Sequence, residues 1–368
     1  MKKIKLLVQT ISKKYPIIIG SNIIKDIKSI IRSNKIYFNK CLIVADKNVP
    51  KKNLLILKKK NLCKKILIHI FNPSEKNKNQ QSVNKIIDKL LINNFNRNDC
   101  IISLGGGITG DVTGFVASIY KRGLKYVNIP TTLLAQVDSS IGGKTGINNV
   151  YGKNLVGTFF QPDLVLSDIN LLKTLPKREI VCGYGEILKH SLIDNKKIFN
   201  YLDKNKFNIL KLKSPYIEKA IADSCKIKKT IVQKDENEKN LRKILNLGHT
   251  FAHAYEAALG FSKKLNHGEA VILGIKSAAK FSLENKFLTK KKYIKIQSHI
   301  RQLKLPNNLS KLFSNKKIDL ILNYMKSDKK NNSANINLIL LKDIGKPIIK
   351  TNFNIKKIRK FLKGELNN

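Results

Sequence analysis

Three residues in the second half of the chain have the chemistry of a metal site. They are Glu186 in GYGEILKH, His249 in NLGHTFAH and His267 in LNHGEA. Two neutral imidazoles and one carboxylate can hold a divalent ion and leave coordination positions open for a substrate, which is typical of a catalytic site. His249 and His253 are four residues apart, so in a helix both rings project from one face. Glu186 completes the set only if its helix packs against theirs, which spacing alone does not establish.

A glycine-rich turn lies upstream of these residues. The segment CIISLGGGITGDVTGFVASIY reads as strand, turn and helix, and Gly105, Gly107 and Gly110 satisfy GxGxxG. Backbone amides at such a helix start can bind a pyrophosphate, whereas the alternative is a plain tight turn. The acidic residue usual about twenty positions later is missing. Asp46, at the end of an earlier strand, is free to meet a ribose hydroxyl, and a metal with a dinucleotide suggests redox chemistry on a hydroxylated substrate.

The stretch from residue 129 to residue 159 is rich in Gly, Ser, Thr and Asn, with few residues able to build a core. Its length and composition are typical of a binding loop on a rigid scaffold, and the alternative is an ordinary surface loop. Lys144, Lys153 and Asn154 suit a phosphate or carboxylate, and Asp138 suits a hydroxyl.

Cationic side chains recur farther along, at Lys189, Lys228 and Arg242. In a chain this rich in lysine, any one of them is most simply a surface residue. Arginine is scarce here, and its planar fork holds carboxylate or phosphate bidentately, so Arg242 carries more weight as an anion-binding residue.

Short apolar segments alternate with helical ones in the first half, which predicts parallel strands joined by crossover helices. Strands are predicted at 5–11, 40–46, 65–71, 100–107, 125–132 and 164–168, with a helix at 83–94. Later the periodicity is mostly helical, at 186–202, 216–233, 249–258, 268–285 and 290–302. We expect an α/β Rossmann-like N-terminal domain (1–178) followed by a mainly α-helical C-terminal domain (179–368). Segment 336–341 reads as a small hairpin or as a strand returning to the first domain.

The charge balance is strongly basic. The 368 residues include 71 basic and 25 acidic side chains, a formal net charge of +46. Clustered cations would indicate nucleic-acid binding, but these lysines are spread and accompany abundant Ile and Asn, as expected from a coding bias. We therefore expect no specific nucleic-acid partner, with salt-sensitive nonspecific RNA binding as the alternative. Such a field would still attract a small anionic substrate.

The apolar segments and the cysteines indicate in which cellular compartment the protein is expected. No apolar run approaches the roughly 20 residues that cross a bilayer, so we expect no membrane association. The five cysteines are an odd number without a CxxC pair, which argues against a disulfide framework and a cysteine-ligated zinc. We expect a soluble cytoplasmic protein.

Six motifs taken together resemble the 3-dehydroquinate synthase family of sugar-phosphate cyclases. They are GGGITGDVTGFVASIYKRG, IPTTLLAQVDSSIGGKTGIN, GKNLVGTFFQP, GYGEILKH, LNLGHTFAHAYE and NHGEAV, and the resemblance spans nearly the whole chain. It implies conversion of 3-deoxy-D-arabino-heptulosonate 7-phosphate to 3-dehydroquinate and phosphate. The implied steps are transient oxidation by NAD, phosphate elimination, re-reduction and intramolecular aldol closure, with one divalent zinc or cobalt ion.

The resemblance also implies a role for each residue that matches a family motif. The metal ligands are Glu186, His249 and His267. Substrate contacts fall on Asp138, Lys144, Asn154, Lys189, Lys228, Arg242, Asn246 and His253. Arg122 matches an arginine that reaches the substrate phosphate across a homodimer interface. Cofactor contacts fall on Asp46, Asn48, Glu75, Lys78, Gly105, Gly106, Gly107, Asp111, Thr131, Thr132, Lys144, Lys153, Thr174, Leu175 and Glu179. One further substrate lysine is either Lys329 or Lys330.

Two alternatives stay open. A related sugar-phosphate cyclase would share these motifs, and an NAD-dependent polyol dehydrogenase would share the two-domain plan but release NADH. His253, beside the metal, could relay a proton from the hydroxyl being oxidised, or could itself be a metal ligand. Ser74 stands where the family commonly has glycine, a departure next to the cofactor contact implied for Glu75.

Overall fold

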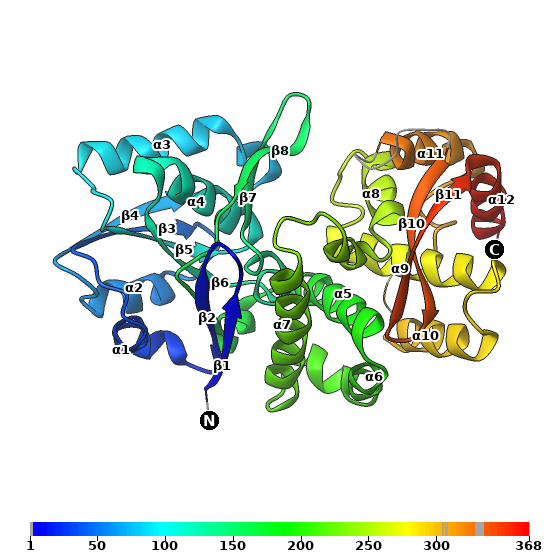
Figure 1. The fold of residues 1–368 in the computed structure, drawn as a ribbon, viewed down its shortest axis with the longest axis horizontal. Helices are drawn as coiled ribbons and strands as arrows, with labels where there is room; N and C mark the ends of the chain where they lie inside the picture. The colour runs from blue at the N-terminus through cyan, green and yellow to red at the C-terminus, as the bar shows by residue number, and fades with distance from the viewer. Residues whose placement is uncertain (1–2, 304, 306–307, 328–334, 368) are drawn as a thin grey trace. The chain divides into compact units, whose positions relative to one another are not determined.

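The structure is a computed structural model that describes residues 3–303, 305, 308–327 and 335–367 (Figure 1). It divides into two compact units. The first comprises Met1–Ile180 with Ile217–Asn237, and the second comprises Val181–Tyr216 with Glu238–Asn368. Residues 217–237 therefore belong to the first unit, although they follow residues of the second unit in the sequence. The domain limits predicted from the sequence, 1–178 and 179–368, stay a prediction.

A seven-stranded sheet forms the first unit, in the order β1-β2-β9-β6-β5-β3-β4. Its strands are β1 (Ile4–Gln9), β2 (Lys14–Gly20), β3 (Lys40–Asp46), β4 (Lys65–Phe71), β5 (Cys100–Gly105), β6 (Lys125–Pro130) and β9 (Leu164–Asp168). All neighbours pair in parallel except β1 with β2. The central strands β3, β5, β6 and β9 are buried along almost their whole length because helices cover both faces. The sequence predicted one initial strand, whereas the chain turns back at Thr10–Lys13 and makes two.

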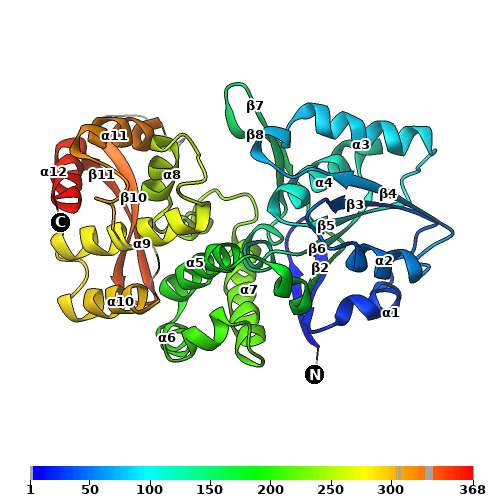
Figure 2. The same cartoon turned by 180° about the vertical axis from the view of Figure 1, so that it is seen from behind.

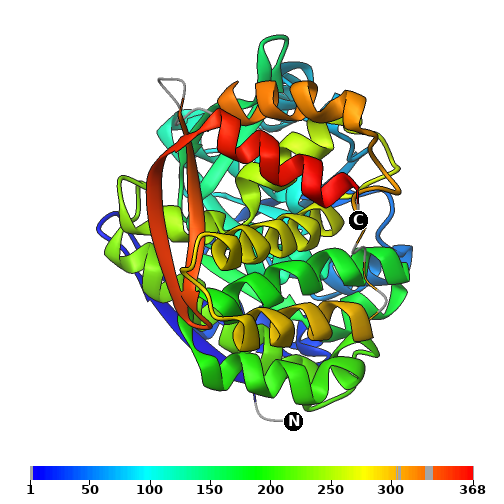
Figure 3. The same cartoon turned by 90° about the vertical axis from the view of Figure 1, so that its right-hand side faces the viewer.

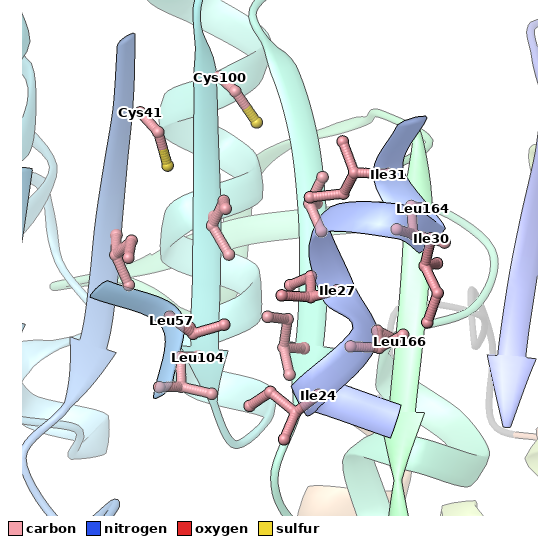
Figure 4. Packing of buried hydrophobic residues seen from close by; sticks show 14 of the residues in the cluster. Ile24, Ile27, Ile30, Ile31, Cys41, Leu57, Cys100, Leu104, Leu164 and Leu166 are labelled. Carbon is pink, nitrogen blue, oxygen red and sulfur yellow. The ribbon is translucent and has the colours of Figure 1, made fainter. Parts of the chain in front are cut away.

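Helices cover the two faces of this sheet (Figures 1 and 2). One face carries η1 (Ile23–Asp26), α1 (Ile27–Ser33) and α2 (Lys51–Lys59), and the other carries α3 (Gln80–Ile92) and α4 (Gly107–Ile119). Ile27, Ile30 and Ile31 of α1 pack with Leu104 and Leu166 of the strands in one buried cluster (Figure 4). A second cluster lies under α3 and α4. Burial of these apolar side chains supplies the main stabilisation of the unit.

The glycine-rich segment between β6 and β9 is not an open loop. It contains a single π-helical turn, η4 (Ala135–Ser139), and a hairpin of β7 (Lys144–Asn149) with β8 (Gly152–Phe159) that projects past α3 (Figure 2). Gly146 lies opposite Gly157, where an added Cβ would meet backbone of the facing strand at 2.6 and 2.1 Å respectively. The hairpin is therefore built by glycines that permit close strand approach, which the loop-like composition concealed.

The remaining elements of the first unit are short turns and one long helix. They are η2 (Glu75–Asn77), η3 (Tyr120–Arg122), η5 (Ile169–Thr174) and α7 (Tyr216–Lys234).

The second unit is mainly helical, as predicted, so the α/β fold followed by a helical part is confirmed. Helix α5 (Lys177–Asp194) begins in the first unit and continues here. The others are α6 (Lys196–Leu210), η6 (Leu241–Asn246), α8 (His249–Ala258), α9 (His267–Glu284), α10 (Lys290–Gln302), η7 (Asn315–Lys317), α11 (Ile318–Ser327) and α12 (Ile355–Leu366). No helix among the described residues combines the length and apolar character needed to cross a bilayer.

One hairpin belongs to this helical unit. Strands β10 (Asn335–Asp343) and β11 (Lys346–Asn354) pair only with each other, and β10 packs against α9 (Figure 3). Of the two possibilities left open by the sequence, the small hairpin is the one observed.

The helical stretch predicted at 186–202 is two helices. Asn195 lies between α5 and α6 in an extended conformation, and its side-chain oxygen accepts a hydrogen bond from Lys197 N at 2.8 Å. An asparagine cap satisfies a backbone donor at the helix start, so the chain can change direction without burying an unpaired amide.

A hydrogen-bonded network of polar side chains joins α5, α6 and α10. Tyr184 Oη lies 2.8 Å from His299 Nε2, and His299 Nδ1 lies 2.8 Å from Asp203 Oδ1. The hydrogen bond from His299, with support from Lys206, lowers the pKa of Asp203 to about 2. Burial lowers the pKa of His299 even though Asp203 opposes the shift. Nδ1 therefore donates to Asp203, and Nε2 accepts from Tyr184.

The lowered pKa of His299 in this network predicts that the stability of the protein depends on pH. The His299 pKa is lowered in the folded state, so below pH 6.5 the unfolded chain binds a proton that the folded chain does not. Stability is full above 6.5 and falls as the pH drops toward the folded pKa, by up to about 1.4 kcal/mol per pH unit. Thermal unfolding measured between pH 7 and 5 should show that the stability of His299→Gln changes less with pH than that of the wild type. Equal pH slopes for the two proteins would contradict the assignment of His299 as a neutral buried imidazole.

Candidate functional site

Helices α5 and α9 cross at two glycines that lie next to predicted metal ligands. A Cβ on Gly185 would lie 2.7 Å from the carbonyl oxygen of Gly268, and a Cβ on Gly268 would lie 2.2 Å from Cys182 Cα. Only residues without side chains fit at such a crossing. Glu186 follows the first glycine and His267 precedes the second, so this contact brings their backbones together.

A second glycine pair brings α8 against α9. Gly248 has φ +78° and precedes His249, and an added Cβ would lie 2.6 Å from Ile275 N. On α9, a Cβ on Gly274 would lie 2.2 Å from the Gly248 carbonyl oxygen. The start of α9 is fixed by a capping box in which Asn266 N donates to Glu269 Oε2 at 2.8 Å.

The three predicted metal ligands converge. Glu186 Oε1 lies 3.5 Å from His249 Nε2 and 3.9 Å from His267 Nε2, and one ligand atom from each residue lies within 4.8 Å of the others. Metal–ligand bonds of 2.0–2.1 Å in a tetrahedral site place donor atoms about 3.3 Å apart. The two separations measured from Glu186 Oε1, 3.5 and 3.9 Å, are close to this spacing, so the three side chains could close around one divalent ion.

Burial and a neighbouring ammonium keep His249 in its neutral form. The Glu186 side chain is 1% exposed, and the ammonium of Lys189, itself 2% exposed, forms an ion pair with its second oxygen, Oε2. Burial holds the pKa of His249 well below its usual range, and the charge of Lys189 adds to the shift. His249 is thus neutral near pH 7, the form that ligates metals.

His253 lies beside this set but is not part of the closest triad. Its ring centroid is 5.3 Å from that of His249 and 6.0 Å from that of His267, and it is exposed. His253 also belongs, with Glu256 and His267, to a second group whose ligand atoms lie within 4.8 Å of one another.

Glu256 is a site residue that the sequence reasoning missed. Its Oε2 lies 3.0 Å from His267 Nδ1. Burial lowers the pKa of His267, but the hydrogen bond and charge of Glu256, with the charge of Glu186, outweigh it and raise the pKa overall. The sequence feature that could have identified Glu256 is its position in HTFAHAYE, seven residues after His249, which places both residues on one face of a helix.

Two more predicted substrate residues of the second unit lie in η6. Arg242 is 2% exposed, which is unusual for arginine and indicates a specific role rather than a surface position. Asn246 Nδ2 donates to Glu238 Oε1 at 3.0 Å. Lys329 and Lys330 lie outside the described residues.

In the first unit, the glycine turn lies where the strand order reverses. In the sheet, β4 lies on one side of β3 and β5 lies on the other side. The carboxyl ends of the neighbouring strands β3 and β5 are therefore adjacent. In open α/β sheets, ligands bind at this crevice. An added Cβ on Gly105 would lie 2.8 Å from Asp46 Cβ, one on Gly106 3.1 Å from Thr132 Cγ2, and one on Gly107 3.0 Å from Ser139 Oγ. Burial raises the pKa of Asp46 against hydrogen bonds from Asn48 and Gly106.

A buried lysine organises the predicted cofactor residues near this turn. Lys78 is 4% exposed, and its Nζ lies 2.5 Å from Asp111 Oδ2 and 2.6 Å from Asn154 Oδ1. Burial raises the pKa of Asp111, although Lys78 opposes the shift. Asn148, which the sequence did not single out, donates to Glu75 Oε2 at 2.8 Å and accepts from Asn154 N at 3.0 Å.

Asp138 and Lys228 also meet within the first unit. Lys228 Nζ lies 2.7 Å from both Asp138 Oδ1 and Asp138 O, so α7 is joined to the π-helical turn. The other predicted positions lie at element ends and turns: Asn48 after β3, Arg122 in η3, Thr131 and Thr132 after β6, Lys144 at the start of β7, Lys153 in β8, Thr174 at the end of η5, Leu175 after it, and Glu179 in the first turn of α5.

Comparison with known proteins shows the family of the chain. Two family profiles match the chain, 3-dehydroquinate synthase N-terminal over residues 68–182 and 3-dehydroquinate synthase C-terminal over residues 183–331. The 3-dehydroquinate synthase of Pelagibacter ubique (strain HTCC1062) is 60% identical over 367 residues, covering 100% of each chain.

Solved structures share the fold. A 2-deoxy-scyllo-inosose synthase, crystallised with carbaglucose-6-phosphate, NAD+ and Co2+, has a TM-score of 0.87 at 25% identity, over 99% of this chain and 100% of that chain. A glycerol dehydrogenase from Schizosaccharomyces pombe has a TM-score of 0.71 at 15% identity over 100% of this chain and 91% of that one, which shows the fold alone.

The parallel-sheet unit and the helical unit place the chain in the fold class that 2-deoxy-scyllo-inosose synthase and glycerol dehydrogenase share. Within that class, the full-length identity and the two matching profiles settle the family. The chain belongs to the 3-dehydroquinate synthase family.

The crossing of α5 and α9 gives a prediction. Gly268→Ala places a methyl group against the Cys182 backbone, so the helices must separate; we expect a loss of about 3 kcal/mol of stability and at least roughly ten-fold weaker zinc binding. Urea unfolding and competition with a chelator measure the two effects.

The matched control is Gly364→Ala in α12, where an added Cβ meets nothing within 4 Å. This change should stabilise the helix by roughly 0.5–1 kcal/mol and leave zinc binding unchanged. Equal behaviour of the two variants would refute the role assigned to the crossing.

Proposed function

We propose that the protein converts 3-deoxy-D-arabino-heptulosonate 7-phosphate to 3-dehydroquinate and phosphate, as a carbon-oxygen lyase that uses NAD and one divalent metal ion. The observation that carries the proposal is the convergence of Glu186, His249 and His267 in a chain that is 60% identical, end to end, to a 3-dehydroquinate synthase.

The donor set fits the metal. Glu186 Oε1 and the Nε2 atoms of His249 and His267 would hold zinc or cobalt, since imidazole and carboxylate suit both ions. A related cyclase with 25% identity was crystallised with NAD+ and Co2+, which supports both cofactors.

The glycine turn fits the nucleotide. A side chain on Gly106 or Gly107 would fill the space beside Thr132 and Ser139, so the bare backbone at the start of α4 can meet a pyrophosphate. Asp46 and Asn48 would meet a ribose, and the Lys78–Asp111–Asn154 network would hold the hairpin strand β8 in place beside it. The remaining predicted contacts, including Glu75, Thr131, Lys153, Thr174, Leu175 and Glu179, are proposed on their family match.

When bound, the metal would supply Lewis acidity toward substrate hydroxyls, and NAD would supply a reversible hydride acceptor. The chain's own residues supply charge and proton transfer. Lys189 and Arg242, both buried and cationic, would stabilise negative charge that develops on the substrate. Exposed His253, beside the ligand imidazoles, can take up a proton from a substrate hydroxyl. Lys144, Asn154, Asp138, Lys228 and Asn246 would bind and orient the substrate.

The proposal includes a homodimer and a cytoplasmic location. Lys121 and Arg122 both adopt left-handed backbone conformations, with φ of 47° and 63°, and both side chains are exposed. Non-glycine residues rarely adopt this conformation, and it is often associated with function. An arginine presented in this way can serve a partner subunit's substrate phosphate. Five free cysteines agree with a reducing compartment.

The assay for this function measures two products. With zinc, NAD and the heptulosonate phosphate, we expect inorganic phosphate without accumulation of NADH, because the cofactor is reoxidised in each turnover. A chelator should abolish phosphate release, and added zinc should restore it. Glu186→Gln should reduce the rate by more than roughly 100-fold because one metal ligand is lost.

The outcome separates the alternatives. Stoichiometric NADH with a polyol and no phosphate would identify a dehydrogenase, with which the present similarity is of fold only. Phosphate release from a different sugar phosphate, and none from the heptulosonate, would identify a related cyclase.

A further inference from the structure

Glu256 occupies a position on α8 from which it can control a metal ligand. It is one turn beyond His253 and two turns beyond His249, and its side chain is 12% exposed. Its carboxylate oxygen Oε2 lies 3.0 Å from Nδ1 of His267, which belongs to a different helix, α9. This contact links the two helices that carry the histidines of the site.

The hydrogen bond selects one nitrogen of His267 for the metal. A carboxylate only accepts, so Nδ1 must carry the hydrogen, and in the neutral ring the lone pair is then on Nε2. Nε2 is the atom that lies 3.9 Å from Glu186 Oε1. His249 shows the same arrangement with a backbone partner, because its Nδ1 lies 3.3 Å from Leu247 O while its Nε2 faces Glu186 at 3.5 Å.

The same bond restricts which nitrogen of His267 can bind a metal. His253, Glu256 and His267 form a second group with ligand atoms within 4.8 Å of one another. Nδ1 of His267 cannot bind a metal in either group while it donates its hydrogen to Glu256. Nε2, which lies 3.9 Å from Glu186 Oε1, is therefore the ligand atom that the hydrogen bond leaves available.

We propose that Glu256 is a positioning residue for the metal centre, which holds His267 with Nε2 directed at the ion and makes the ring a stronger ligand. Carboxylates that accept from ligand imidazoles have this effect in metal sites, and their loss typically weakens metal binding 10–100-fold. The inference rests on the proposed function only in requiring that Glu186, His249 and His267 bind zinc.

The test compares three variants of the full chain. Glu256→Ala removes the acceptor, and Glu256→Gln keeps an acceptor oxygen but removes the charge. Asp319→Asn is the control, since it removes one carboxylate from the same unit at a side chain that is 70% exposed. Zinc affinity is measured by chelator competition, the ligand set by the visible spectrum of the cobalt-substituted protein, and the His267 tautomer by nitrogen-15 NMR of the metal-free protein.

We expect zinc affinity to fall about 10–100-fold in Glu256→Ala and less in Glu256→Gln, with Asp319→Asn equal to the wild type. The cobalt spectrum should keep its ligand number, and Glu256→Ala should lose the pure Nδ1–H tautomer. Unchanged affinity in Glu256→Ala, or a cobalt spectrum that reports a lost ligand, would overturn the proposal. Failure of the wild type itself to bind zinc would instead refute the metal site of the proposed function.

Discussion

Gly268 lies so close to the backbone of Cys182 that no side chain could stand between α5 and α9, and Gly248 lies equally close to α9 at Gly274. These contacts determine where the three proposed metal ligands lie. Glu186, His249 and His267 each adjoin one of the glycines, so the distance between ligands is set by backbone contact, not by long flexible side chains. Capping of α9 by Asn266 and Glu269 fixes the start of the helix on which His267 lies. The backbone therefore holds the proposed ligands near one another without an ion.

Much of the fold and of the candidate site could be predicted from the sequence. The apolar strands β3, β5 and β6 read clearly because they are buried on both faces, and helices α8 to α10 read from their periodicity. The ligand triad could be proposed from residue type, and family motifs added the positions around it. Convergence of Glu186 with the histidines could not be derived, because it depends on glycine contacts between helices that are about eighty residues apart in sequence.

Other features were hidden for similar physical reasons. The β7–β8 hairpin looked like a loop because glycines that allow close strand approach also favour turns. The return of α7 to the first unit leaves no mark in composition, and neither does the link from Lys228 to Asp138 that accompanies it. Glu256 and Asn148 were not singled out because their contacts with His267 and Glu75 depend on how the chain folds.

The central claim is that one ion is held by Glu186 Oε1, His249 Nε2 and His267 Nε2. Anomalous X-ray diffraction at the zinc edge from crystals of the zinc-loaded protein tests it most directly. The account predicts a single strong peak within about 2.0–2.2 Å of all three atoms. A peak bound instead by His253 and Glu256, or no ordered ion at the triad, would contradict it.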